Sequence, residues 1–163
     1  WDSRPRSRLV LFSKEHPEVA DAAFTSPYSL QEDVQAWMEH YGLFQPWCYP
    51  TEFVCYKYLV SIDGNTFASN LWWQLLSNSA VLKNESDYIE WFYKGLSPYV
   101  HYVPYALDLS DFQERVTWLQ QHDPEATLVA ERGRLFAQEH LSNESLVFYF
   151  YRLLQAYAVL QIP

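Results

Sequence analysis

The sequence predicts an α/β fold, in which a Rossmann-like, mainly parallel sheet is flanked by helices. Between residues 56 and 112, short apolar runs alternate with amphipathic segments. Polar turn residues stand where the apolar runs end, and helical periodicity dominates from residue 110 onward. Strands separated by helices imply right-handed crossovers and therefore a parallel arrangement.

The N-terminal region is expected to supply one strand and one helix. Residues 9–13 (LVLFS) form a continuous apolar run bounded by polar residues, which is typical of a buried strand. A helix over 30–41 would end at Gly42 and place four residues on one face: Val34, Trp37, Met38 and Tyr41. Two prolines, Pro46 and Pro50, indicate a connecting loop over 44–55.

The central region is expected to contain the other three strands. These are residues 58–62, 79–83 and 101–105, separated by helices over about 67–76 and 88–96. The first of these strands is followed by Asp63-Gly64-Asn65, whose residue types strongly favour a turn.

The C-terminal region is predicted to be helical. Ser110 and Gln113 have capping-box spacing, and a stripe follows at Phe112, Val116 and Leu119. Asp123-Pro124 indicates a second helix start, with Asp as N-cap. That helix would present a small-residue face for close packing: Ala126, Val129, Ala130, Gly133 and Ala137. Ser142 is expected to cap a last helix with its own stripe: Leu146, Phe150, Leu153, Leu154 and Tyr157.

Length, net charge and composition limit the classes of function that the sequence supports. A length of 163 residues fits one domain, or the greater part of one half of a two-domain protein. The net charge of −9 argues against a nucleic-acid-binding surface, although a local basic pocket is compatible with it. The conspicuous basic cluster consists of Arg4, Arg6 and Arg8. It is interpreted either as a solvated tail or as a phosphate-binding site. The aromatic content of 18% indicates an aromatic-rich core, with sugar-stacking rings as the alternative.

Cysteine usage and targeting signals leave the compartment open. Cys48 and Cys55 are too few for a disulfide framework, and their spacing is not a zinc pattern. Asn84 and Asn143 begin N-glycosylation tripeptides, which matter only in a secretory protein. The sequence shows neither a signal peptide nor a spanning segment. Because it begins with Trp1, we expect a fragment or a processed product.

The strongest candidate site is the turn after the second predicted strand. Asp63-Gly64-Asn65-Thr66 precedes a predicted helix whose first turn includes Ala68, Ser69 and Asn70. Backbone N–H groups there, with the Thr66 and Ser69 hydroxyls, could hold a diphosphate. An ordinary strand-to-helix turn is the alternative, because neither a full GxGxxG nor a P-loop is present.

Several ordered segments carry a family resemblance: YKYLVSIDGN (56–65), LLSNSAVLK (75–83), EWFY (90–93) and HYVPYALDLSDF (101–112). They resemble the capsule-associated, lipopolysaccharide-modifying glycosyltransferases, a family that includes the protein O-glucosyltransferases. Later segments, such as Ala130-Glu131-Arg132-Gly133, are similar too. The likeness covers nearly the whole chain and is weakest over 28–54.

The resemblance implies a glycosyltransferase-B fold, of which residues 1–163 would be the C-terminal, donor-binding half. The N-terminal acceptor half, with the catalytic base, would be missing. The turn at Asp63 and the start of the following helix would contact the nucleotide diphosphate. The residues of this sequence that match those positions are Gly64, Thr66, Ala68 and Ser69. Family members commonly place an arginine in this helix, where this sequence has Asn70.

Arg4 or Arg6 is therefore expected to supply positive charge to the leaving diphosphate. Glu90 stands where such folds offer a carboxylate to the ribose, with an exposed helix glutamate as the alternative. Lys83 ends a strand and would reach a phosphate or solvent. We expect no metal and no cofactor beyond a UDP-sugar co-substrate, because the acidic pair at Glu85 and Asp87 lacks further ligands.

The expected function is transfer of a glucose- or xylose-type sugar from a UDP-sugar to an acceptor hydroxyl. Glycan, lipopolysaccharide or protein would be the acceptor, and nucleic acid would not be a partner. The expected setting is the cytoplasm, as a peripheral enzyme at the inner membrane face, with the endoplasmic reticulum or Golgi lumen as the alternative. A non-catalytic interaction module that keeps the fold is the second hypothesis.

Overall fold

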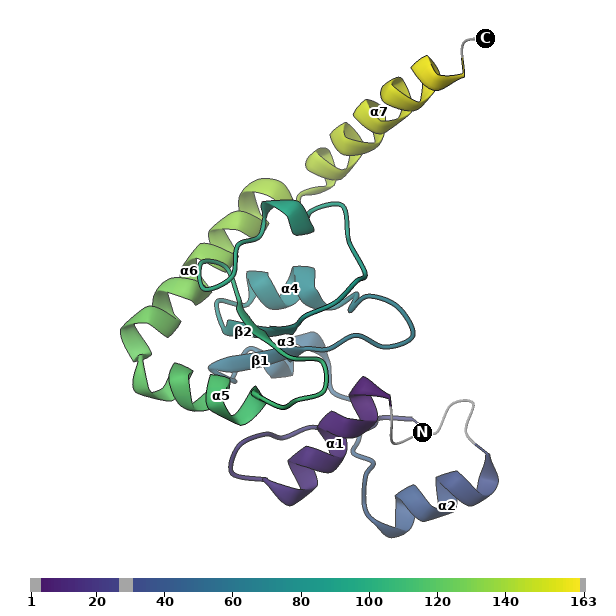
Figure 1. The fold of residues 1–163 in the computed structure, drawn as a ribbon, viewed down its shortest axis with the longest axis vertical. Coiled ribbons are helices and arrows are strands. Elements are labelled where there is room, and N and C mark those ends of the chain that lie inside the picture. Colours follow the sequence, from purple (N-terminus) through teal and green to yellow (C-terminus); the bar gives the residue numbers. More distant parts are fainter. Residues whose placement is uncertain (1–3, 27–30, 162–163) are drawn as a thin grey trace.

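The computed structural model describes residues 4–26 and 31–161, and its centre is a parallel sheet (Figure 1). The sheet has three strands in the order β1-β2-β3. Their bounds are β1 Tyr58–Ser61, β2 Ala80–Asn84 and β3 Val103–Tyr105. Val60 lies opposite Leu82, and Leu82 lies opposite Val103. The predicted α/β class and these three strands are therefore confirmed.

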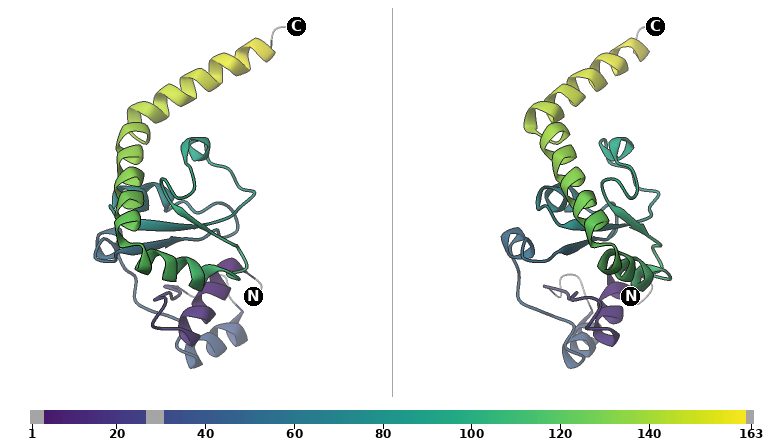
Figure 2. Two further views of the ribbon diagram at one scale, coloured as in Figure 1. Left: turned by 60° about the vertical axis from the view of Figure 1, so that its left-hand side comes forward. Right: turned by 90° about the vertical axis from the view of Figure 1, so that its left-hand side faces the viewer.

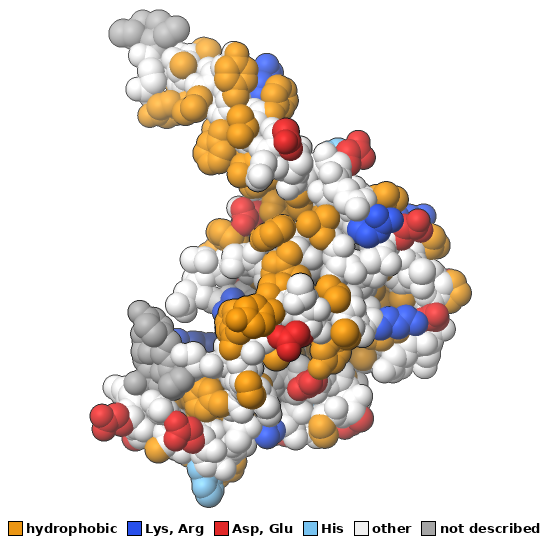
Figure 3. Space-filling model, turned by 180° about the vertical axis from the view of Figure 1, so that it is seen from behind, with side chains coloured by type: hydrophobic (Ala, Val, Ile, Leu, Met, Phe, Trp, Pro, Cys, Tyr) orange, Lys and Arg blue, Asp and Glu red, His pale blue; other side chains and the backbone are white. Residues whose placement is uncertain are grey.

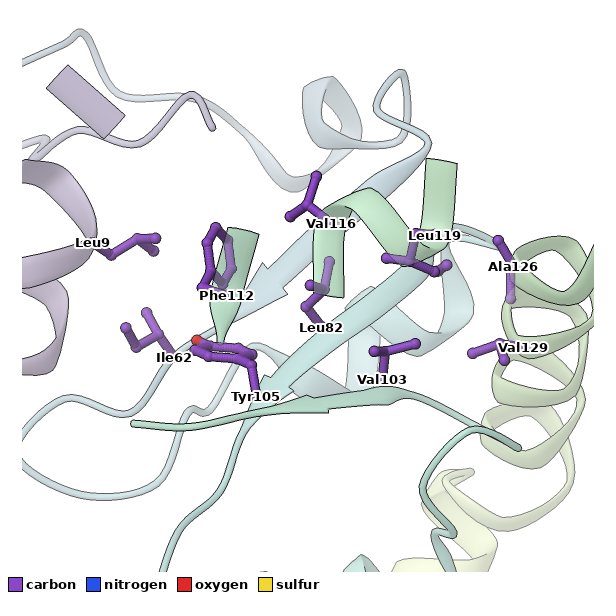
Figure 4. Packing of buried hydrophobic residues seen from close by; sticks show 12 residues of the cluster. Leu9, Ile62, Leu82, Val103, Tyr105, Phe112, Val116, Leu119, Ala126 and Val129 are labelled. Atoms are coloured by element: carbon purple, nitrogen blue, oxygen red, sulfur yellow. The ribbon is translucent and has the colours of Figure 1, made fainter. Parts of the chain in front are cut away.

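Helices cover both faces of the sheet. They are α4 Leu71–Leu76, α5 Phe112–Gln121 and α6 Asp123–His140. Leu82 packs with α5 and the first turns of α6 in the larger cluster, shown in Figure 4. Val81 points to the opposite face, because neighbouring strand residues alternate, and there it packs with α4. Burial on both faces explains why every residue of β2 is buried.

Helix α6 runs along the sheet and joins the two clusters. Ala126, Val129 and Ala130 belong to the larger cluster, whereas Ala137 belongs to the smaller one. Gly133 lies between them, where an added Cβ would stand 2.8 Å from the carbonyl oxygen of His101. The predicted small-residue face is confirmed, since small side chains allow this close approach. The helix N-cap is His122, one residue before the predicted Asp123.

The prediction of a strand over 9–13 was wrong, because these residues lie in helix α1, Pro5–Glu15. A short apolar run does not distinguish a strand from a buried helix segment. Proline at the first helical position favours a helix. Leu9 enters the larger sheet cluster, whereas Val10 packs with Met38 of helix α2.

Helix α2, Glu32–His40, confirms the predicted helix, whose expected start at residue 30 lies outside the described residues. Within the predicted loop 44–55, a short helix α3 spans Pro50–Phe53. Cys48 and Cys55, on either side of α3, are free and exposed.

Three predictions in the middle of the chain were wrong: a helix start, a whole helix and a helix cap. Helix α4 begins at Leu71 rather than near 67, because the preceding residues are held in a turn. Residues 88–96 contain only the 3₁₀ turn η1, Tyr93–Gly95, since Trp91 and Phe92 pack down onto the smaller cluster. Helix α5 is preceded by Asp111 rather than by a Ser110 capping box.

The last helix, α7 Asn143–Leu160, extends away from the sheet and its covering helices (Figures 1 and 2). Its predicted cap is confirmed, because Ser142 Oγ accepts a hydrogen bond from the Ser145 N–H at 3.1 Å. None of its residues is buried. Among the described helices, none is both long and apolar enough to cross a membrane.

Candidate functional site

The polar residues predicted to bind ligand gather at one edge of the sheet. Since the strands are parallel, their carboxyl ends at Ser61, Asn84 and Tyr105 meet at the same edge. Tyr105 Oη donates to the Ser61 carbonyl at 3.2 Å, which ties the two outer strands across β2. Ligands bind at this edge in open α/β sheets.

Two hydrogen bonds join the turn after β1 to the end of β2. The Asp63 N–H donates to Asn84 Oδ1 at 2.9 Å, and Asn84 Nδ2 donates to Asp63 Oδ2 at 3.1 Å. The other carboxylate oxygen of Asp63 accepts from the Ala68 N–H at 2.9 Å. Asp63 and Asn84 are 3% and 1% exposed, so the role that this geometry supports for Asp63 is to shape the turn.

Some backbone N–H groups of the turn donate hydrogen bonds to acceptors within the turn itself. The Gly64 N–H donates to the Thr66 carbonyl at 3.0 Å, and the Ala68 N–H is held by Asp63. Thr66 and Ser69 are exposed and precede α4, so their hydroxyls lie in a turn rather than in a helix. Asn70 is the N-cap residue of α4, and its Oδ1 lies 3.4 Å from Ser61 Oγ as acceptor.

Arg6 of α1 lies against Gly64. A Cβ built on Gly64 would stand 3.0 to 3.2 Å from three atoms of the Arg6 guanidinium. The absence of a side chain at Gly64 therefore leaves space for a cation over the turn. Arg4 is the exposed N-cap residue of the same helix. Of the two arginines, Arg6 is the one that the structure brings to the turn.

The end of β2 carries a buried cation. Lys83, 7% exposed, donates from Nζ to the Asn84 carbonyl at 3.0 Å, and its Nζ lies 4.6 Å from the centroid of the Tyr93 ring. Burial lowers the pKa of the Lys83 ammonium, and the Asp63 carboxylate opposes part of that fall.

Beside this lysine lies a phenol with an unpaired hydroxyl. Tyr93 Oη is buried and has no hydrogen-bond partner among the residues that the structure describes. Burial raises the pKa of the Tyr93 phenol, and the carboxylates of Asp63 and Glu90 add to the rise. A buried polar atom of this kind calls for a partner such as a ligand or water.

A cavity of about 360 Å³ opens at this edge. Residues from β2, β3 and the loop between them line it, including Lys83, Ser86, Tyr88, Tyr93, Lys94 and Tyr102. Tyr88 Oη donates to the Asn65 carbonyl at 3.1 Å, which connects this loop to the turn after β1. Such a volume is within the range of small-molecule sites.

Glu90 lies in the loop before η1 rather than in a helix. Its side chain is half-buried, and burial raises the pKa of its carboxyl, with a hydrogen bond from the Trp91 backbone acting against that rise. Its carboxylate contributes to the raised pKa of Tyr93, so Glu90 lies near that ring. The structure brings Arg6, Asp63, Gly64 and Lys83 to one edge of the sheet.

Sequence reasoning missed two residues of this edge. Asn84 is predicted from the sequence only as the start of a glycosylation tripeptide, although a polar residue at the end of a buried strand is a usable signal for a site residue. Tyr93 belongs to the EWFY segment that carries the family resemblance, and its unpaired hydroxyl depends on tertiary packing. Within the described part of the chain, no three His, Cys, Asp or Glu side chains are placed to hold a metal ion.

The sheet, its flanking helices and the polar groups beyond its carboxyl ends define a Rossmann-like α/β domain. Comparison with known proteins gives the family: the sequence pattern of glycosyl transferase family 90 matches residues 2–162. The chain belongs to that family.

Its relatives include protein O-glucosyltransferases. Protein O-glucosyltransferase 2 of Danio rerio is 36% identical over 99% of this chain and 32% of its own length. Protein O-glucosyltransferase 3 of Rattus norvegicus is 40% identical over 99% of this chain and 31% of its own. Human protein O-glucosyltransferase 1 is 32% identical over 96% of this chain and 39% of its own. The chain thus spans about a third of the length of these relatives.

Proposed function

We propose that this chain is the donor-binding part of a longer glycosyltransferase. The reaction would move a glucose- or xylose-type unit from a UDP-sugar to an acceptor hydroxyl, on protein by analogy with the relatives' names, or on a glycan or lipopolysaccharide. The observation that carries the proposal is the meeting of Arg6, the Gly64 turn and Lys83 at the carboxyl edge of a family 90 domain.

In the proposed reaction the acceptor oxygen attacks the anomeric carbon, and the bond from that carbon to the diphosphate oxygen breaks. The departing diphosphate gains negative charge, so fixed cations and donors stabilise the transition state. Arg6 offers a guanidinium over the turn, and the exposed hydroxyls of Thr66 and Ser69 offer donors beside it. The acceptor proton would pass to a base outside this chain, in a preceding acceptor half.

The cavity at β2 and β3 is assigned to the remainder of the nucleotide sugar. Lys83 and Tyr93 Oη would donate to its oxygens, since both are polar groups with few partners in a largely apolar setting. Glu90, half-buried and near Tyr93, would accept from a ribose hydroxyl.

Calorimetry with UDP on the full-length protein tests this assignment. We expect Arg6→Ala to weaken binding about 10- to 100-fold, the worth of one charge-assisted hydrogen bond. Arg8→Ala is the matched control, because Arg8 is also an exposed arginine of α1. Equal affinities for the two variants would remove Arg6 from the site, and a wild-type protein that binds no nucleotide would refute the donor-domain proposal.

The second candidate is a non-catalytic interaction module. It is favoured by Asn70, which stands where the resemblance leads one to expect an arginine and whose Oδ1 faces Ser61. Transfer assays with UDP-sugars on the full-length protein separate the two candidates, since any turnover excludes a purely non-catalytic role.

A further inference from the structure

Lys83 is buried in a way that is unusual for a lysine. On the face of the molecule shown in Figure 3, Lys and Arg side chains lie at the surface in scattered places, where water solvates them. Lys83 is only 7% exposed, and it lines the cavity of about 360 Å³ at the carboxyl edge of the sheet. Lysine is almost never fully buried unless it is paired, so the partners of Lys83 decide what its amine can do.

Lys83 makes no ion pair with a carboxylate among the residues that the structure describes. Its Nζ donates to the Asn84 carbonyl at 3.0 Å and lies 4.6 Å from the centroid of the Tyr93 ring. The Asp63 carboxylate acts on Lys83 electrostatically, but its two oxygens accept hydrogen bonds from the Ala68 N–H and Asn84 Nδ2. A neutral carbonyl and a ring face therefore replace most of the water that would stabilise an ammonium.

This environment favours the neutral form of the amine. Burial lowers the pKa of the Lys83 ammonium, so a larger share of this side chain is neutral at a given pH than of a solvated lysine. A neutral amine has a free lone pair, and desolvated lysines are the ones that form Schiff bases with carbonyl compounds. Lys83 thus combines a nucleophilic form with a position on a cavity wall.

The cavity suits an aromatic aldehyde that carries an anionic group. Its lining includes three tyrosines and two lysines: Lys83, Tyr88, Tyr93, Lys94 and Tyr102. Tyrosine rings offer faces and edges against which an aromatic ring can pack. The two lysines outnumber the one carboxylate of the lining, that of Glu85, and Lys94 is exposed, so it can pair with an anion.

We propose that Lys83 is a carbonyl-reactive amine, and that this cavity is a reversible covalent site for small aromatic aldehydes with an anionic group. The Lys83 nitrogen attacks the carbonyl carbon to form a carbinolamine, which loses water to give an imine. Tyr93 Oη, buried and without a partner among the described residues, can donate a proton to the departing hydroxyl and recover one from the nitrogen. Amine and aldehyde thus become imine and water, without an oxidant or a reductant.

Labelling of the full-length protein with pyridoxal phosphate tests the proposal. Borohydride traps the imine at neutral pH, and peptide mass spectrometry identifies the labelled lysines. We expect Lys83 to be labelled at least about fivefold faster than Lys94, although Lys94 is the more exposed, because a lowered pKa enlarges the neutral fraction of the amine. Lys83→Arg keeps the positive charge and should carry no label at position 83, and circular dichroism checks its fold.

The role of the anionic group is tested at the second lysine. Lys94→Met should slow the labelling of Lys83 by pyridoxal phosphate about fivefold, the worth of one charged contact. The same variant should leave labelling by pyridoxal, which lacks the phosphate, unchanged. An equal effect on both probes would overturn the assignment of the anionic group to Lys94.

Two results would overturn the reactive lysine itself. One is labelling of Lys83 at the same rate as Lys94, or more slowly, in the folded wild-type protein. The other is a preference for Lys83 that persists in urea, because it would then come from the local sequence rather than from burial. Calorimetry with UDP on the same preparations keeps the proposals apart: absent labelling with intact UDP binding refutes the reactive lysine alone, and labelling without UDP binding refutes the donor domain alone.

Discussion

The two ends of the carboxyl edge differ in how fully their polar groups are paired. At the β1 end, both oxygens of the buried Asp63 carboxylate accept hydrogen bonds. At the β2 end, Lys83 has one carbonyl partner and Tyr93 Oη has none among the described residues. A network in which every polar atom is hydrogen-bonded makes the local structure rigid, whereas buried polar atoms without partners can still bind a ligand. The Asp63 network is therefore interpreted as the scaffold that holds the turn beneath Arg6, and the groups of Lys83 and Tyr93 as binding surface.

Asp63→Ala should have the largest effect, because it tests the scaffold directly. It leaves the buried Ala68 N–H without an acceptor and removes one of the two hydrogen bonds that Asn84 Nδ2 donates, so we expect a loss of about 3 kcal/mol in unfolding free energy. Urea unfolding followed by tryptophan fluorescence measures the loss. Asp87→Ala, an exposed aspartate, makes the same charge change and should cost little. A loss below about 1 kcal/mol for Asp63→Ala would contradict the scaffold interpretation.

Lys83→Met should separate stability from binding at the other end. Replacing a buried cation with an apolar chain of similar length should raise the unfolding free energy by about 1 kcal/mol at neutral pH. UDP affinity should fall about tenfold through the lost charged donor. Lys94→Met, exposed in the same cavity, is the control for stability. A variant that loses stability and keeps its affinity would show that Lys83 is structural.

The same variant makes a pH prediction. Because burial lowers the pKa of Lys83, between that pKa and the ordinary value of 10.5 the unfolded state binds more protons than the folded one. Wild-type stability should therefore rise with pH across this window, and Lys83→Met should remove the rise. The raised pKa of Tyr93 acts in the opposite direction only above about 10, where an unfolded tyrosine ionises. Parallel stability profiles for the two proteins below pH 10 would contradict the prediction.

Tyr93→Phe tests the unpaired hydroxyl with a smaller change. The ring under Lys83 stays, and removal of an unsatisfied buried group should leave stability equal or higher by about 1 kcal/mol. If Tyr93 Oη meets the ligand, nucleotide-sugar affinity should fall about fivefold. Tyr102→Phe, in the same cavity, is the comparison. A destabilised variant with unchanged affinity would show that the Tyr93 hydroxyl has a structural role rather than a role in binding.

Gly64→Ala should have the smallest effect on stability. The three atoms nearest to the methyl group would belong to the guanidinium of Arg6, the far end of a flexible side chain, so a change within about 0.5 kcal/mol is expected. UDP affinity should fall as Arg6 is displaced, and calorimetry measures that fall. A large loss of stability would show that the turn itself needs glycine.

Elements with strong local periodicity were predictable from the sequence. The buried strands at 58–62 and 79–83 and the small-residue face of α6 follow from residue spacing, and the Ser142 cap follows from its hydroxyl. The prediction of a strand over 9–13 was wrong, because four or five apolar residues suit either a strand or a helix. The prediction of a helix over 88–96 was wrong, since burial of Trp91 and Phe92 outweighs local propensity.

The sequence by itself determined the α/β class, the family resemblance and the turn at Asp63-Gly64-Asn65, because all three depend on residues near one another in the chain. The tertiary structure alone decided how the site is built. Asp63 meets Asn84, Arg6 of α1 reaches Gly64, and Lys83 packs on Tyr93 through contacts that local spacing does not encode. Hydrogen bonding and burial act between groups close in space, so the scaffold and the binding surface became distinguishable only once the strands were placed side by side.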